Sequence, residues 1–259
     1  MEKKKGISGS TLKMIAIVTM LIDHIGAVVL ARLLMVNGLG ELDQTNTDAI
    51  MQWLSANGAL YGTYTVMRMI GRVAFPIFCF LLVEGFLHTH DVKKYAMRLG
   101  LFALLSEIPF DLAFSSKILE FNYQNVFFTL FIGLLTMIAY RAVEEKEEWG
   151  QAWKVILYIL IVAAGMALAY FLKTDYAEKG VFCIMVLYIF RKKKMWQIIA
   201  GCASFIWETP ALFGFIPIAF YNGTRGWKMK YFFYIFYPAH LLILYLLCYF
   251  MGISGYSAV

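Results

Sequence analysis

The chain has 259 residues, of which 61% are hydrophobic and 15% charged, and its mean hydropathy is +0.68. Soluble domains are typically about 45–50% apolar and about 25% charged, so the composition excludes an ordinary soluble protein and indicates one embedded in a lipid bilayer. The net charge of +6 does not indicate a nucleic-acid partner, because the basic residues form short clusters between apolar runs rather than a surface that follows phosphates.

Apolar runs follow one another along the chain and predict an all-α fold, a polytopic transmembrane helix bundle with about nine membrane segments. A membrane-spanning helix needs about 20 residues, with a lower end of about 17. Three runs are shorter, and we expect them to be half-helices, re-entrant segments or helices buried inside the bundle, where protein or a cavity covers irregular backbone. The predicted segments are 11–34, 63–88, 93–114, 124–142, 152–172, 177–190, 195–207, 209–221 and 230–251.

The distribution of Lys and Arg predicts the orientation of this bundle. Basic clusters such as 191–194 and 225–230 fall on one side of the predicted segments, and few basic residues fall on the other. By the positive-inside rule, the N-terminus is cytoplasmic and the C-terminus lies outside, in a chain that crosses the cell membrane several times. The predicted parts are a basic tail (1–10), one transmembrane domain (11–251) with an acidic outer loop (35–60) that forms a lid or a surface helix, and a C-terminal tail (252–259).

The cysteines give no sign of a disulfide framework or of a metal centre. Cys79, Cys183, Cys202 and Cys248 all lie in apolar runs, and none belongs to a CxxC pair. We therefore expect no metal. No small-residue cleavage site follows the first apolar run, so the first helix is expected to be retained.

Asp23 and His24 lie near the middle of the first predicted segment. A charge at the centre of a bilayer costs at least about 2.5–3.5 kcal/mol on insertion scales. One interpretation is a polar pair that is satisfied inside the bundle. The other is a reactive centre in which His24 acts as a general base, because imidazole exchanges protons near neutral pH. Adjacent helix residues do not face each other, so we expect Asp23 to contact another helix.

Basic residues inside the predicted helices have two interpretations. Arg68 and Arg72 are four apart and share one helical face, where they either clamp a phosphate or pair with buried carboxylates such as Glu84 or Glu107. Lys13, at the start of the first helix, either extends its charge to the membrane surface or contacts a cofactor.

Glu107 and Asp111 are also four apart and flank Pro109. They serve either as an acid and a base or as partners of Arg68, Arg72 and Arg98. We expect the pairing role, because a buried carboxylate without a cation tends to take up a proton.

The last third of the chain holds three more candidate features. Glu208, at a break between two short segments, either lines a substrate site or caps a helix at the outer surface. The turn at 221–226, with Asn222 and Arg225, either approaches phosphates or is a plain cytoplasmic turn. His240 follows Tyr237 and Pro238 and is the second histidine inside a predicted span, with a structural or a functional role.

Several blocks of the sequence resemble the TraX family, from about residue 11 to about residue 250. The family is named for a conjugal-transfer protein that acetylates the N-terminus of pilin. Lys13 and His24 have a spacing similar to that of acyltransferase-3 and lysosomal glucosaminide N-acetyltransferase proteins. The blocks are IAIVTMLIDHIGAV after Lys13, GRVAFPIFCFLLVEGF (71–86), RLGLFALLSEIPFDLAF (98–114), NVFFTL (125–130), YNGTRG (221–226) and FYPAHL (236–241).

The resemblance implies an integral membrane acetyltransferase. It would transfer acetyl from cytoplasmic acetyl-CoA to an amine or hydroxyl of a protein N-terminus, a glycan or a lipid headgroup, with His24 as general base or transient acyl carrier. The sequence leaves open whether the chain forms a homo-oligomer. The expected residues are His24, Asp23, Glu107 and His240 for catalysis; Lys13, Arg68, Arg72, Arg98, Asn125, Asn222 and Arg225 for the donor; and Glu84, Asp111, Glu208 and Tyr237 for the acceptor.

A transporter is the alternative. Buried Asp, Glu, Arg and His residues also build proton relays, and short broken helices suit a proton-coupled carrier. No internal repeat supports this alternative in the sequence.

Overall fold

The computed structural model describes residues 5–228 and 230–257, and over these residues the fold is built from helices without a strand. Residues 1–4 of the predicted basic tail and 258–259 of the C-terminal tail lie outside the described residues. The helices are α1 (Gly9–His24), a π-helical segment (Ile25–Leu30), α2 (Ala31–Val36), α3 (Thr47–Gly71), α4 (Ala74–His88), α5 (Val92–Ser115), α6 (Val126–Glu144), α7 (Gln151–Phe171), α8 (Ala177–Ile189), α9 (Lys194–Ser204), a 3₁₀ segment (Thr209–Gly214), α10 (Phe215–Ala219) and α11 (Lys230–Phe250).

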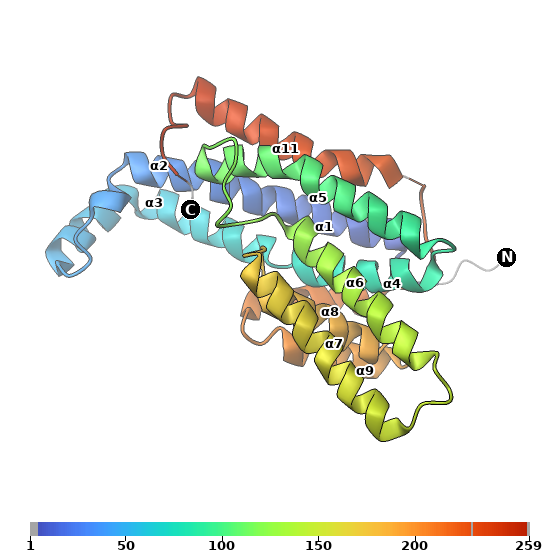
Figure 1. Ribbon diagram of the computed structural model, residues 1–259. Helices are drawn as coiled ribbons and strands as arrows, with labels where there is room; N and C mark the ends of the chain where they lie inside the picture. Colours follow the sequence, from blue (N-terminus) through green and yellow to red (C-terminus); the bar gives the residue numbers. More distant parts are fainter. Residues whose placement is uncertain (1–4, 229, 258–259) are drawn as a thin grey trace.

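Two groups of helices cross each other at an angle (Figure 1). The first group contains α1, α3, α5 and α11, with α1 packed on α3 and α5 packed on α11. The second contains α6, α7, α8 and α9, in which consecutive helices pack on one another. α4 contacts both α1 and α8 and so joins the groups.

Five stretches of the described chain are long and apolar enough to cross a membrane, which supports the prediction of a membrane protein. The nine predicted crossings and their orientation stay a prediction. α5 is long enough to span, but it carries Lys93, Lys94, Arg98, Glu107 and Asp111. The candidate spans are Gly9–Val36, Thr47–His88, Val126–Glu144, Gln151–Phe171 and Phe232–Phe250.

The predicted outer loop at 35–60 is shorter in the structure, because α3 begins at Thr47. The side chain of Asn46 accepts a hydrogen bond from the backbone of Ala49 at 3.1 Å and caps the helix. Good helix formers such as Ala, Met, Gln and Leu follow it. Residues 47–60 therefore form the first part of α3, and the connection between α2 and α3 is reduced to residues 37–46.

α3 and α4 form one long crossing with a break at Arg72 and Val73. Pro76 explains the break, because proline has no N–H to bond a carbonyl one turn earlier and is tolerated only in the first turn of a helix. A second irregularity is the π-helical segment directly after His24. Such segments are frequent at functional sites, since they free carbonyls and re-aim side chains.

Candidate functional site

A small cavity lies where α1, the α3–α4 break, α5 and α11 meet, and its volume is about 50 Å³. That volume has room for a few water molecules. Aromatic side chains form much of the wall, including Phe75, Phe110 and Phe114. Charged and polar groups also face it, among them Asp23, His24, Arg68, Arg72, Tyr123, Asp175, Tyr176 and Tyr237.

Asp23 contacts another helix, as expected. Its Oδ2 lies 2.7 Å from Nη1 of Arg68 on α3, in a partly buried ion pair. The close approach depends on Gly71, because a Cβ built there would lie 2.0 Å from the Cβ of Asp23. Gly71 thus lets the carboxylate sit against the end of α3, directly beside the helix break.

Arg72 occupies the break itself and pairs with Glu208, at 3.3 Å between Nε and Oε1. Its guanidinium also hydrogen-bonds the side chain of Tyr176. Arg68 and Arg72 therefore each have a carboxylate partner on another element. The expectation that Glu107 or Asp111 pairs with them is wrong, because those two carboxylates face α6 and the loop after α5.

Glu107 and Asn125 contact each other between α5 and α6. Asn125 also donates to the carbonyl of Ala103 at 2.8 Å and accepts from the backbone of Phe127 at 3.0 Å, so its side chain caps α6. Neither residue lines the cavity. Their catalytic and donor-binding roles stay predictions that the geometry does not support.

Asp175 enters the cavity from the turn between α7 and α8. The turn is fixed by backbone hydrogen bonds to Gln124 of 3.0 and 2.8 Å, and Tyr123 donates to Asp175 Oδ1 at 2.9 Å. The next residue, Tyr176, has a φ of 64° and its ring stacks on Phe75 at 3.6 Å between centroids. Left-handed backbone in a bulky residue is costly, and it clusters at binding sites.

His24 lines the cavity and contacts His240 of α11 behind it. Nδ1 of His24 lies 2.6 Å from Nε2 of His240, and Nδ1 of His240 lies 2.7 Å from the carbonyl oxygen of Phe236. Both histidines are almost fully buried. Phe114 and Tyr237 meet the ring of His24 edge-on.

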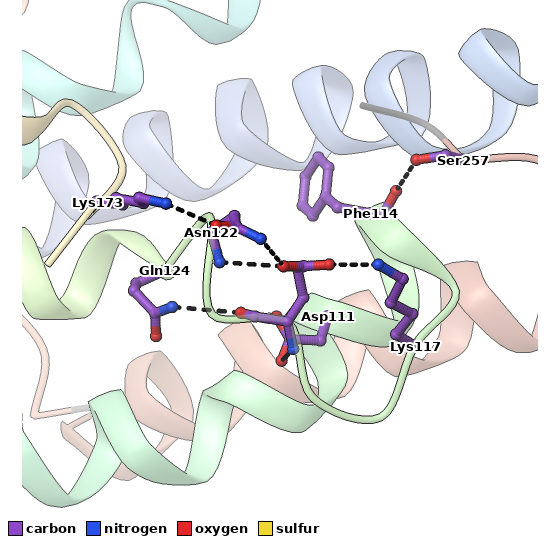
Figure 2. Close-up of polar contacts among 8 residues, drawn as sticks. Asp111, Phe114, Lys117, Asn122, Gln124, Lys173 and Ser257 are labelled. Carbon is purple, nitrogen blue, oxygen red and sulfur yellow. Dashed lines mark hydrogen bonds and ion pairs between the residues drawn. The ribbon is translucent and has the colours of Figure 1, made fainter.

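Polar side chains of the loop after α5 form a network of contacts with α5 and with Lys173, as Figure 2 shows. Asp111 accepts a hydrogen bond of 2.8 Å from the backbone of Glu120. Lys117 and Asn122 bind the carboxylate of Glu120 and lower its pKa to about 2. Lys173 donates to Asn122 at 2.6 Å and ties this loop to the turn that carries Asp175. Asp111 thus holds this loop in place, and its role at the acceptor stays a prediction.

The remaining predicted residues lie toward the end of the bundle where α1 begins. Lys13 sits 5.1 Å from the ring centre of Phe233, and Arg98 hydrogen-bonds the side chain of Tyr234. The Asn222 side chain accepts from Thr224 within its own turn. The carbonyl of Arg225 accepts from Ser10 at 3.0 Å. Glu84 contacts Tyr221 and His88.

Sequence reasoning missed Tyr123, Asp175 and Tyr176. The sequence signal for Asp175 and Tyr176 is the polar interruption at 173–176, which separates the apolar runs 152–172 and 177–190. The distribution of Lys and Arg predicts an outer loop there, and only the fold shows that the turn bends inward. Among the described residues, no cluster of His, Cys, Asp and Glu is arranged to hold a metal ion.

These features define a class, a polytopic helical membrane protein with a charged, aromatic-lined cavity between its helices. The chain belongs to the TraX protein family, whose match covers residues 8–248. The prediction of the family is therefore confirmed, and the more distant similarity to acyltransferase-3 proteins stays a prediction.

A relative from Dichelobacter nodosus is described as a probable fimbrial assembly protein FimC of serogroup H1. It is 26% identical over 206 residues, which cover 70% of this chain and 82% of the relative. No solved structure matches the chain.

Proposed function

We propose that this protein is a membrane acetyltransferase that moves an acetyl group from acetyl-CoA to an amine or hydroxyl. The observation that carries the proposal is the imidazole of His24, which faces a cavity inside the bundle beside the ion pairs of Arg68 and Arg72. Membership of the TraX family and a relative described as a fimbrial assembly protein agree with a surface protein as acceptor. A glycan or a lipid headgroup also carries an amine or hydroxyl that could accept the acetyl group in this reaction.

In the proposed reaction, the nitrogen or oxygen of the acceptor attacks the carbonyl carbon of the thioester, and His24 takes up the proton that this atom loses. The tetrahedral intermediate then collapses, the C–S bond breaks, and the protonated imidazole returns the proton to the sulfur. The products are the acetylated acceptor and the free thiol. Each of the two arginines in the cavity wall is paired with a carboxylate, so their positive charges are balanced inside the bundle.

Substitution of the base tests the proposal. We expect His24→Gln to lower acetyl transfer by about 10²–10⁴-fold, the usual contribution of a general base. Transfer is measured as thiol release from acetyl-CoA by protein purified in detergent, with an N-terminal peptide, an amino sugar and an aminophospholipid as acceptors. His90→Gln is the matched control, because His90 is exposed at the far end of α4. Full turnover in His24→Gln with a monodisperse sample would refute the role of His24.

The donor's phosphates need cations, and Arg68 and Arg72 are already paired. Lys13, Arg98 and Arg225 have no carboxylate partner in the described part of the chain, and Arg225 acts electrostatically on Lys13. A bound phosphate would relieve the repulsion between the two cations. We therefore assign the nucleotide end of the donor to the end of the bundle where α1 begins.

This assignment predicts a split between binding and turnover. Lys13→Gln and Arg225→Gln should raise the KM for acetyl-CoA several-fold and change kcat little, because the contact is the same in the ground and transition states. S-acetylpantetheine lacks the nucleotide, so its KM should not change. Lys192→Gln is the control, since that lysine is exposed on a basic turn. An equal rise in KM for both donors would contradict the assignment.

Proton-coupled transport is the outcome that would replace acetyl transfer. Acetyl-CoA that binds the folded protein raises its melting temperature by mass action. If millimolar acetyl-CoA gives no shift and no thiol is released, while vesicles with the purified protein take up solute with protons, the proposal fails.

A further inference from the structure

The hydrogen bonds of the two histidines fix which nitrogen carries a proton. A backbone carbonyl can only accept, so Nδ1 of His240, 2.7 Å from the oxygen of Phe236, must be N–H. Neutral imidazole has one N–H, which leaves a lone pair on Nε2 of His240. Nδ1 of His24, 2.6 Å away, then donates to that lone pair. Nε2 of His24 is left with the free lone pair that a base requires.

The two rings are aligned for transfer of a proton. Their planes are 2° apart and their centres 4.9 Å apart. A nitrogen lies about 1.1 Å from the centre of a five-membered ring with bonds of about 1.35 Å. Given the 2.6 Å between nitrogens, the rings therefore lie end to end in one plane and are not stacked face to face. The N–H of His24 points along the lone pair of His240.

We propose that His240 is a positioning residue that holds His24 in its Nδ1–H form and shares the proton gained during catalysis. This inference rests on the proposed function. When Nε2 of His24 takes the acceptor's proton, the Nδ1 proton of His24 shifts to Nε2 of His240. When the C–S bond breaks, Nε2 of His24 gives its proton to the sulfur, and the Nδ1 proton returns from His240. No proton or electron is gained or lost over the cycle.

The surroundings explain why two rings suit this step better than one. Arg68 and Arg72 line the same cavity as His24, so a positive charge on His24 would lie beside two guanidiniums. His240 does not line that cavity, and its Nδ1 lies 2.7 Å from the carbonyl oxygen of Phe236. Movement of the charge to His240 carries it away from the arginines and toward that oxygen. Asp23 lies on the arginine side and is already paired with Arg68.

Nitrogen-15 NMR of labelled histidine tests the hydrogen bond without any assay of activity. The sample carries His88→Gln and His90→Gln, so that only the buried pair gives signals. We expect His24 in the Nδ1–H form, with its Nε2 signal that of an unprotonated nitrogen. In His240→Phe the Nδ1–H form should lose its preference. His24 in the Nε2–H form in the parent protein would overturn the inference.

Kinetics separates the two roles of His240. The oxygen of a glutamine can accept from His24 but cannot take up its proton. We expect His240→Gln to keep the Nδ1–H form and to lower kcat by about 10-fold, and His240→Phe to lower it by about 10²-fold. The KM for acetyl-CoA should change less than about threefold in both, because neither touches the donor.

Three outcomes test the proposed role of His240. A kcat in His240→Phe equal to that of the parent protein overturns the inference. Equal losses in the glutamine and phenylalanine variants, with the Nδ1–H form kept in glutamine, overturn the positioning role, whereas a smaller loss in glutamine supports it. If the parent protein transfers no acetyl group but NMR shows the Nδ1–H form, the proposed function fails and with it the catalytic part of the inference, while the hydrogen-bond direction stands.

Discussion

Arg32 is the largest fully buried side chain among the described residues, and its partners are neutral. It donates to the carbonyls of Tyr256, Val28 and Ala113 at 2.6–2.9 Å, and to the hydroxyl of Ser116 at 2.9 Å. The carbonyls come from the π-helical segment, the end of α5 and the C-terminal segment. One guanidinium therefore holds together three parts of the chain that are distant in sequence.

Arg32→Met should destabilise the protein strongly. Each buried carbonyl that loses its donor costs about 1–3 kcal/mol, so we expect a loss of about 3 kcal/mol or more in the free energy of unfolding. Denaturant unfolding in detergent, followed by tryptophan fluorescence, measures it. Arg141→Gln is the control, since its ion pair with Glu145 is exposed and worth about 0–1 kcal/mol. Equal stability of the two variants would contradict this account.

At the scale of elements, the site depends on two interruptions of regular helix. α1 changes to π-helix directly after His24, and the α3–α4 crossing breaks at Arg72 and Val73. The break aims Arg72 into the cavity, and Gly71 lets α1 approach. Irregular backbone inside a membrane protein is tolerated where protein or a cavity covers it, as this cavity does.

Two glycines of α3 offer a matched test. A methyl group on Gly71 would overlap Asp23, whereas nothing lies within 4 Å of one on Gly58. Gly58→Ala should therefore stabilise the protein by about 0.5–1 kcal/mol, because alanine favours helix. Gly71→Ala should lower both the melting temperature and acetyl transfer, since α1 and α3 must move apart. A rise in melting temperature for both variants would show that the close approach is not required.

Helix positions were predictable from the sequence, and contacts between helices were not. The predicted segment 93–114 differs by one residue at each end from α5, and 152–172 agrees with α7 to within one residue. Apolar length and polar interruptions carry that information. The partner of Arg68 is the carboxylate one place before His24, rather than Glu107. Which face of a helix meets which neighbour depends on packing, and one sequence does not record it.

At the scale of the molecule, the turn at 220–227 binds the start of α1. The backbone of Gly9 donates to Thr224 at 2.8 Å, and Trp227 donates to the hydroxyl of Ser10 at 3.0 Å. The turn, for which the sequence left phosphate binding or a plain cytoplasmic turn open, thus joins α10 and α11 to the N-terminal helix. At the opposite end Arg32 joins α2 to the C-terminal segment, so the first and last helices are held together at both ends.

Gly226 and Gly223 test this junction, because both have a positive φ, 71° and 76°. Alanine at either position carries the same backbone strain. Only at Gly226 would the added Cβ meet Ser10, at 2.0 Å from its hydroxyl oxygen. We expect Gly226→Ala to lower the melting temperature more than Gly223→Ala and to speed proteolysis at the N-terminal end of α1. Identical melting temperatures would exclude a role for the junction in stability.

The contact between His24 and His240 joins residues 216 positions apart. A ribosome adds about 5–20 residues per second, so roughly 10–40 s pass between the synthesis of one ring and that of the other. Throughout that time the nascent chain carries His24 without the ring that its Nδ1 contacts. On the proposed function, a chain released early would contain the base without the residue that positions it.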